Sequence, residues 1–377
     1  MQRFFACLTI YLGFAATIAA QIGKNVSVAA GSDEDRALAT IYATPDGPAK
    51  VALLDKFMAD FGKGDLELLA DQLYVQTFLA QKNYAKVYEF GDKALRLDPL
   101  SFSTVVNMVH AAEEQGDVQK LFEEGEKAAA TVARYKASPP PAGTDAKQWE
   151  DLKADGLKGV QADIAYIQYG LVNAAYKTAD ISARLALFDR YVTAFPDSPY
   201  TLNMREQTAL AYQQAQNFPK MADVAQSILA TDPNDISMLL LLADYWSENG
   251  QQLDKAAENA KTALGLLPQA KKPENVSDDQ WQKQIAVQKG LALSSLGAVY
   301  LGNGRNAQAV DAFKQASPLL KPDAFSYARN LYRLGFTLAK MKRIPEARVI
   351  LKEAASINSP YKARAQETLE KINRPHQ

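Results

Sequence analysis

The sequence predicts an all-α fold in which antiparallel helix pairs stack into an α-solenoid, wound as a right-handed superhelix. Apolar residues recur every three or four positions through most of the chain, which places one apolar stripe on each helix. One order of small and large residues returns after 38 positions near the C-terminus. Apolar runs end at prolines, as in LDP at 97–99 and TDP at 231–233, and a proline keeps the preceding residue out of the helical conformation.

Residues 1–20 are expected to form a signal peptide. Arg3 supplies the positive start, Phe4 to Ile18 form the apolar run, and Ala19 and Ala20 provide small residues for cleavage. The run is shorter than the roughly 20 residues that a membrane-spanning helix needs, so no transmembrane segment is predicted. We therefore expect an exported protein, periplasmic or extracellular, with a flexible segment at residues 21–32.

The single cysteine narrows the possible chemistry. Cys7 lies inside the predicted signal peptide, so the mature chain is expected to carry no thiol. This excludes a disulfide framework, a thiolate nucleophile and a cysteine metal site. An exported chain of this length without disulfides favours a bacterial periplasm or exterior.

Three stretches toward the C-terminus share one order of residues. The first helix of each carries Leu239, Leu242, Ala243 and Trp246, then Leu293, Leu296, Gly297 and Tyr300, then Leu331, Leu334, Gly335 and Leu338. The second helix of the two later copies carries Ala309, Phe313 and Ala316, or Ala347, Leu351 and Ala354. This order resembles the tetratricopeptide repeat, a helix–turn–helix of about 34 residues. The resemblance is clearest over residues 235–358, and fainter copies fill the chain upstream.

Packing and the resemblance together predict the domain layout. Gly297 and Gly335 would let the partner helix approach closely, and no helix pair can bury its stripe without a neighbour. The predicted order is degenerate repeats at 33–136, a proline-rich loop at 137–146, repeats with an extended first helix at 147–269, a loop at 270–277, the best-matching repeats at 278–358 and a C-terminal capping helix at 359–373.

Two insertions interrupt the period, at residues 137–153 and 270–285. Each runs from a proline-containing loop into a helix that bears a Gln-Trp pair. We expect Trp149 and Trp281 to brace an overlong first helix against the preceding repeat. Gripping a ligand is the alternative role for these tryptophans.

Residues 302–307, GNGRNA, match the dinucleotide-binding pattern G-x-G-x-x-[GA], and Asp323 follows about twenty positions later. A glycine loop that cradles phosphate must follow a strand, whereas the upstream segment LALSSLGAVYL is helical by its period. We therefore interpret Gly302 and Gly304 as the turn of a helical hairpin. No cofactor is predicted.

Other catalytic or metal-binding patterns are weak. His110 and His376 have no second histidine or cysteine at metal-ligand spacing, and His110 is expected to be a structural residue in a helix. Glu113 and Glu114 are adjacent in sequence, so on a helix they diverge rather than share a site. We interpret such pairs as solvated faces.

In tetratricopeptide proteins the first helices line a concave groove, and the resemblance implies a candidate site there. The groove-facing residues of the last complete repeat would be Arg329, Tyr332, Arg333, Phe336 and Lys340. Guanidinium groups beside aromatic rings suit a carboxylate or another anionic chain. The alternative is a solvated basic face, with the aromatic residues packed on the terminal helix.

The two arginines match basic positions of the family's carboxylate-clamp variant, but the remaining positions differ. Where that variant has two asparagines and a lysine, this chain has Ser295, Asp244 and Leu240. The binding specificity of the variant is therefore not carried over.

The sequence favours a non-enzymatic exported scaffold that binds a protein or peptide, rather than nucleic acid, in its groove, and cell-envelope assembly is a candidate role for it. Net charge is −1 overall, with a basic end: 12 Lys+Arg against 5 Asp+Glu from residue 320 onward. Binding of a glycan or nutrient at the surface or in the periplasm is the alternative function. A helical array supporting a small catalytic domain is a third, although the repeats leave no stretch for such a domain.

Overall fold

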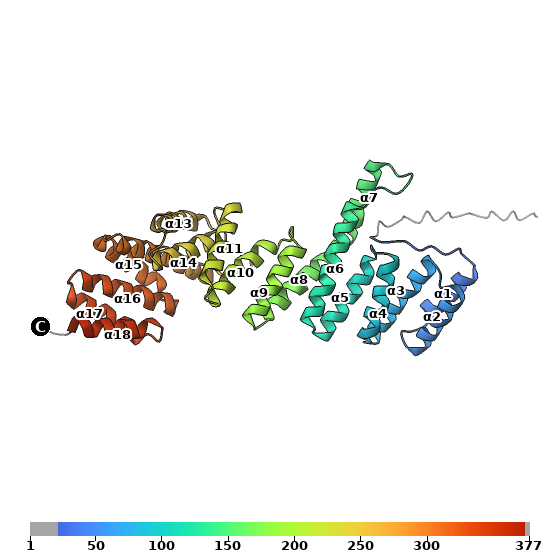
Figure 1. The fold of residues 1–377 in the computed structure, drawn as a ribbon, viewed down its shortest axis with the longest axis horizontal. Coiled ribbons are helices and arrows are strands. Elements are labelled where there is room, and N and C mark those ends of the chain that lie inside the picture. The colour runs from blue at the N-terminus through green and yellow to red at the C-terminus, as the bar shows by residue number, and fades with distance from the viewer. Residues whose placement is uncertain (1–21, 374–377) are drawn as a thin grey trace, which may run out of the picture. The chain divides into compact units, whose positions relative to one another are not determined.

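The fold was derived from a computed structural model, which describes residues 22–373. Within that range every regular element is a helix, and the helices follow one another as antiparallel pairs (Figure 1). This confirms the predicted all-α fold of stacked helix pairs. The predicted signal peptide at residues 1–20 lies outside the described residues.

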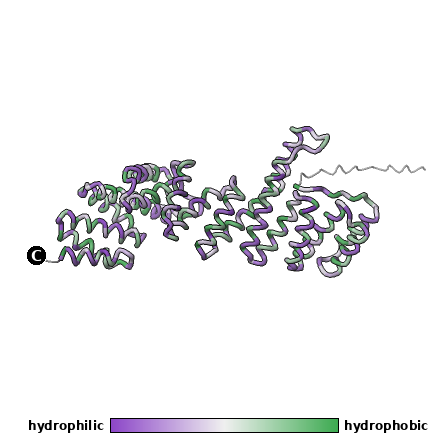
Figure 2. Tube along the Cα trace, in the orientation of Figure 1, coloured by the Kyte–Doolittle hydropathy of each residue, from purple (hydrophilic) through white to green (hydrophobic). Residues whose placement is uncertain are grey.

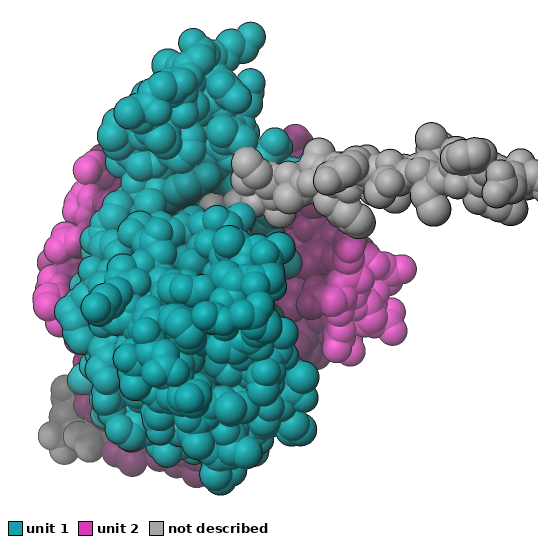
Figure 3. Space-filling view, turned by 90° about the vertical axis from the view of Figure 1, so that its right-hand side faces the viewer, with its two compact units in different colours: residues 1–201 teal, residues 202–377 magenta. Residues whose placement is uncertain are grey.

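The chain divides into two compact units, one up to Thr201 and one from Leu202 (Figure 3). Unit 1 contains α1 Asp33–Ala43, α2 Pro48–Phe61, α3 Asp65–Ala80, α4 Tyr84–Leu97, α5 Phe102–Gln115, α6 Val118–Ala137, α7 Ala146–Gly159, α8 Gln161–Lys177 and α9 Ile181–Ala194. Unit 2 contains α10 Thr201–Gln214, α11 Phe218–Thr231, α12 Ile236–Glu248, α13 Leu253–Leu266, the 3₁₀ turn η1 Leu267–Gln269, α14 Asp278–Gly302, α15 Asn306–Leu320, α16 Ala324–Lys340, α17 Ile344–Ser356 and α18 Tyr361–Asn373.

Helix ends follow local chemistry. Ser277 and Gln280 form a capping box at the start of α14, in which each side chain satisfies a free N–H group of the first turn. Gly116 and Gly250 end first helices with φ of 69° and 65°, a left-handed conformation that glycine adopts without a Cβ clash.

The GNGRNA segment is a hairpin turn. Gly302 is the last residue of α14, Gly304 has φ 73°, and Asn306 begins α15. Asp323 is the N-cap of α16, and its side chain accepts hydrogen bonds from the backbone N–H groups of Phe325 and Ser326. Both features of the dinucleotide-like pattern therefore have local structural roles.

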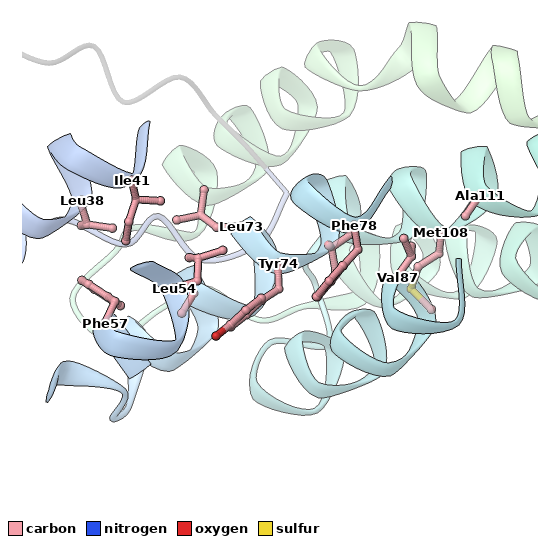
Figure 4. Packing of buried hydrophobic residues seen from close by; sticks show 12 residues of the cluster. Leu38, Ile41, Leu54, Phe57, Leu73, Tyr74, Phe78, Val87, Met108 and Ala111 are labelled. Atoms are coloured by element: carbon pink, nitrogen blue, oxygen red, sulfur yellow. The ribbon is translucent and has the colours of Figure 1, made fainter. Parts of the chain in front are cut away.

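The core of unit 1 extends along the helices rather than around one centre. Hydrophobic and hydrophilic residues are mixed along every helix (Figure 2), so each helix has a side to bury. One buried cluster continues through α1 to α5 (Figure 4), contributed by Leu38, Ile41, Leu54, Phe57, Leu73, Tyr74, Phe78, Val87, Met108 and Ala111. Each pair thus completes its burial against the next, as in repeat proteins generally.

In unit 2 the two helices of a pair pack closely where a glycine faces a large side chain. A Cβ on Gly297 would lie 2.6 Å from a ring carbon of Phe313, and one on Gly335 would lie 2.6 Å from Cγ of Leu351. Phe313 and Leu351 are fully buried. The predicted close approach at these two glycines is therefore confirmed.

Helix α14 is long and apolar enough, by length and composition alone, to cross a membrane. Its buried residues belong to the core of unit 2, where Leu296 and Ala298 pack into two neighbouring clusters. A core helix passes the same test, so this feature does not decide whether the chain has a transmembrane segment.

The first insertion folds back onto the end of α6. Trp149 of α7 donates its indole N–H to the Ser138 carbonyl at 2.9 Å, and its ring meets Tyr135 edge-on at 6.0 Å. Trp149 therefore braces α7 against the preceding helix. The first helix of this repeat differs from expectation, because a break at Val160 divides it into α7 and α8. Around the second insertion, α14 runs unbroken for 25 residues, and the bracing role of Trp281 stays a prediction.

We expect Gly297→Leu to lower the free energy of unfolding by roughly 1–3 kcal/mol, because the new side chain would overlap the ring of Phe313. Gly265→Leu is the matched control, since a Cβ at Gly265 of α13 meets no atom within 4 Å. Urea denaturation followed by circular dichroism measures both variants. Equal stability of the two variants would contradict the helix contact described here.

Candidate ligand-binding groove

Unit 2 contains a groove of about 980 Å³ between its first helices. Apolar and aromatic side chains form most of its wall, chiefly Leu210, Phe218, Leu240, Leu241, Tyr245, Leu291, Phe325 and Tyr361. Asp244, Glu248, Arg329 and Arg364 add charge. A concave site with apolar walls and a few placed polar groups is the usual form of a ligand-binding site.

Arg329 of α16 is paired within the groove itself. Its Nη1 lies 2.7 Å from Oδ2 of Asp244 on α12, and the Arg329 side chain is only 9% exposed. Burial disfavours the charged form of Arg329, but the Asp244 carboxylate more than offsets this and raises the pKa of the guanidinium. Arg329 is therefore a charged group that already has its counter-ion.

Arg333 is paired in the same way, one helical turn further along α16. Its Nη2 donates to the carboxylate of Glu248 on α12, and its Nη1 is 3.4 Å from Oγ of Ser294 on α14. Burial lowers the pKa of Arg333, and the negative charge of Asp244 opposes this shift. Because α14 lies between α12 and α16 and contacts both, the two arginines cross α14 to reach their partners.

The other three predicted site residues lie elsewhere on α16. Tyr332 packs on the core of the last helices, with its ring 5.9 Å from that of Tyr361. Phe336 is 41% exposed, its ring 6.2 Å from Tyr332, and Lys340 is exposed at the end of the helix. Of the five predicted residues, only Arg329 lines the groove. Whether any of the five predicted residues binds a partner stays a prediction.

Sequence reasoning missed the aromatic wall of the groove. Phe218 stacks on Tyr245 with ring centroids 5.8 Å apart, and Phe325 meets Tyr361 edge-on at 5.7 Å. Arg364 lies over the Tyr361 ring at 5.6 Å. Phe218 and Phe325 both occur at the first turn of a helix, outside the repeat pattern, and this position was the available signal.

Neither histidine chemistry nor a metal site is indicated by the described part of the chain. In residues 22–373 no group of three or more His, Cys, Asp or Glu side chains could hold a metal ion. His110 packs its ring on Tyr166, with centroids 4.9 Å apart, as expected for a structural histidine. His376 lies outside the described residues.

Comparison with known proteins gives the fold only. No protein-family model matches the chain, and no curated protein matches it. Among solved structures, the chain is similar to one in the APC/C hetero-tetramer Cut9-Hcn1, with 15% sequence identity and a TM-score of 0.43 over 90% of this chain and 63% of that chain. It thus spans less than two thirds of that chain's length.

Two further solved structures are similar at the same level. Yeast Tom70 has 11% identity and a TM-score of 0.36, over 90% of this chain and 96% of that chain. A tetratricopeptide repeat protein from Parabacteroides merdae has 13% identity and a TM-score of 0.36, over 82% and 98%. At this level of similarity, nothing about ligands or activity is transferred.

We expect Asp244→Leu to destabilise unit 2 by roughly 2–4 kcal/mol, because it leaves the Arg329 charge buried without a partner. Adding Arg329→Met should restore most of the loss, since the pair is then replaced by apolar side chains. Asp223→Leu, at an exposed position of α11, serves as the control and should change stability little. A double-mutant cycle by urea denaturation measures the coupling. If Asp244→Leu alone were as stable as wild type, Arg329 would be solvated rather than paired.

In unit 2 the pKa of one buried carboxyl group, that of Glu206, is raised. Burial, together with the charge and hydrogen bond of Asp235, raises the pKa of Glu206 to about 7 from its usual 4.5. Asp235 is the N-cap of α12 and accepts from the N–H of Met238 at 3.0 Å. The protonated form of Glu206 is therefore the one that the folded unit prefers.

Because the folded pKa is the higher one, this stabilisation is complete below about pH 4.5 and is lost as pH rises through about 7. We expect Glu206→Gln to be more stable than wild type at pH 8 and to show a flatter decline between pH 5 and 8. Glu258→Gln, an exposed change on α13, should follow the wild-type profile. Thermal unfolding across this pH range measures the difference, and identical profiles for all three proteins would contradict the raised pKa of Glu206.

Proposed function

We propose that the chain is a non-enzymatic scaffold that holds a segment of a partner polypeptide in the groove of unit 2. The observation that carries this proposal is a groove of about 980 Å³ whose walls are apolar and aromatic and whose buried Arg329 is already paired with Asp244. Such a surface gains most from burying apolar side chains of a partner.

The ion pairs change the kind of partner that the groove favours. The sequence alone suggests an anionic ligand for Arg329 and Arg333. An incoming carboxylate would have to displace Asp244 or Glu248, which are held at fixed positions on α12. A segment anchored by uncharged apolar or aromatic side chains meets no such competition. We therefore propose this class of segment for the groove.

The location follows from the N-terminal sequence alone. We propose that the protein is exported, that it acts in the periplasm or outside the cell, and that it serves there as a scaffold in assembly of the cell envelope. A second candidate function is the binding of a glycan, because sugar rings pack on aromatic faces. The groove offers four such side chains, Phe218, Tyr245, Phe325 and Tyr361.

A photo-reactive amino acid placed at Phe325 tests the proposal. Phe325 is 47% exposed and lines the groove, whereas Val349 of α17 is 65% exposed and lies outside it. In cells that make the protein, we expect the photo-reactive residue at position 325 to crosslink to polypeptides of defined mass. The same residue at position 349 should crosslink to none of them. Mass spectrometry identifies the attached segment.

The other outcomes separate the alternatives. Adducts that contain carbohydrate and no polypeptide would favour the glycan function. The same adducts from both positions would contradict the groove. Cell-wall hydrolysis that is lost on changing one glutamate would show an enzyme instead.

A further inference from the structure

We propose that unit 1 carries a second binding surface, which takes a positively charged segment of a partner polypeptide. This tyrosine–glutamate surface consists of Tyr84 of α4, Glu113 and Glu114 of α5, and Tyr166 and Tyr169 of α8. It belongs to a different unit from the groove and does not depend on the function proposed for that groove.

Two aromatic side chains of α8 are exposed at this surface. Tyr169 is 56% exposed and Tyr166 is 39% exposed. They are three residues apart on one helix, which places them on the same face. The ring of Tyr166 is held on one side by His110 of α5, and the face of Tyr169 is more open. Exposed tyrosines that are rigidly held are common anchor residues of interfaces.

Two carboxylates of α5 lie beside these rings. Glu113 accepts a hydrogen bond from the Tyr166 hydroxyl, and Glu114 accepts one from the Tyr84 hydroxyl at 2.9 Å. Burial, together with Glu113, raises the pKa of Tyr166 to about 12, so the hydroxyl remains a donor at neutral pH. These hydroxyls fix the positions of the two carboxylates without cancelling their charge.

The charge of this surface is not balanced within unit 1. Neither Glu113 nor Glu114 forms an ion pair with a lysine or arginine of the described chain, although Glu89, Glu124 and Glu126 of the same unit all do. Residues 22–201 contain 19 Lys+Arg against 26 Asp+Glu, a net charge of −7. The local and the overall charge therefore both attract a cation.

Carboxylates beside tyrosine faces favour a guanidinium or ammonium group in particular. Such a cation can form an ion pair with the glutamate while lying over the ring of a neighbouring tyrosine, within about 6 Å of its centroid. Tyr169 offers the open ring for this contact, and Glu113 lies next to its neighbour Tyr166.

The extent of the surface indicates a chain rather than a small ion. It crosses three successive helix pairs, and packed helices lie roughly 8–10 Å apart, so it spans about 20 Å. An extended polypeptide covers that distance with about six residues. Glu113 and Glu114 bind different tyrosines and do not converge, which suits two basic residues along one segment and not a single metal ion.

Isothermal titration calorimetry of the full chain with a peptide of alternating arginine and serine, about nine residues long, tests this proposal. We expect binding that weakens between about 50 mM and 200 mM salt, because exposed charges are screened. The Glu113→Gln and Glu114→Gln double variant should bind about tenfold more weakly, and Tyr169→Ala about threefold more weakly. A glutamate–serine peptide of equal length should not bind.

Matched variants separate this surface from the overall charge of the unit. Asp151→Asn with Asp155→Asn removes two charges from exposed positions of α7, and Tyr42→Ala removes a tyrosine that is 59% exposed on α1. Both should keep wild-type affinity. The proposal fails if the arginine peptide binds the Glu113/Glu114 variant as tightly as wild type, if the aspartate variant loses as much affinity, or if the glutamate peptide binds equally well. Circular dichroism confirms that each variant is folded.

Discussion

The structure depends on each helix pair burying the apolar face of the neighbouring pair. A single pair leaves one side of its stripe in water, so burial becomes complete only along the stack. Within a pair, the two helices approach closely where a glycine faces a large side chain, as at Gly297 with Phe313 and Gly335 with Leu351. Because most apolar residues are buried between helices, the remaining helix faces are available for polar and aromatic groups, and both proposed surfaces lie on such faces.

The same stacking accounts for the ion pairs of unit 2. A buried arginine must have a partner, since an unpaired charge in the interior is costly. Arg329 and Arg333 are four residues apart on α16, and Asp244 and Glu248 are four residues apart on α12, so the two helices present matched spacings across α14. Replacing such pairs by apolar residues is often neutral for stability. Their role is therefore to fix the position of α12 relative to α16 around the groove.

Features that depend on nearby residues could be predicted from the sequence, and features that depend on the stack could not. Left-handed Gly116, the glycine contacts and the turn at GNGRNA follow from residues within one or two helices. The carboxylate that neutralises Arg329 is 85 residues away, and Tyr166 is 53 residues from Glu113. No periodic pattern connects such distant positions. The break at Val160 was missed because the apolar period continues on both sides of it.

The two surfaces would hold their partners by different forces. In the groove Asp244, Glu248 and Arg329 are held in ion pairs, so binding there rests mainly on apolar contact and should change little with salt. At the tyrosine–glutamate surface the charges are unpaired, so binding there should weaken as salt rises. Placing both on one chain lets a weak contact at one surface raise the effective concentration of the same partner at the other, provided that the partner can reach both. A scaffold built in this way gains affinity from two modest sites, and either site can be removed by mutation without unfolding the helix pairs that carry the other.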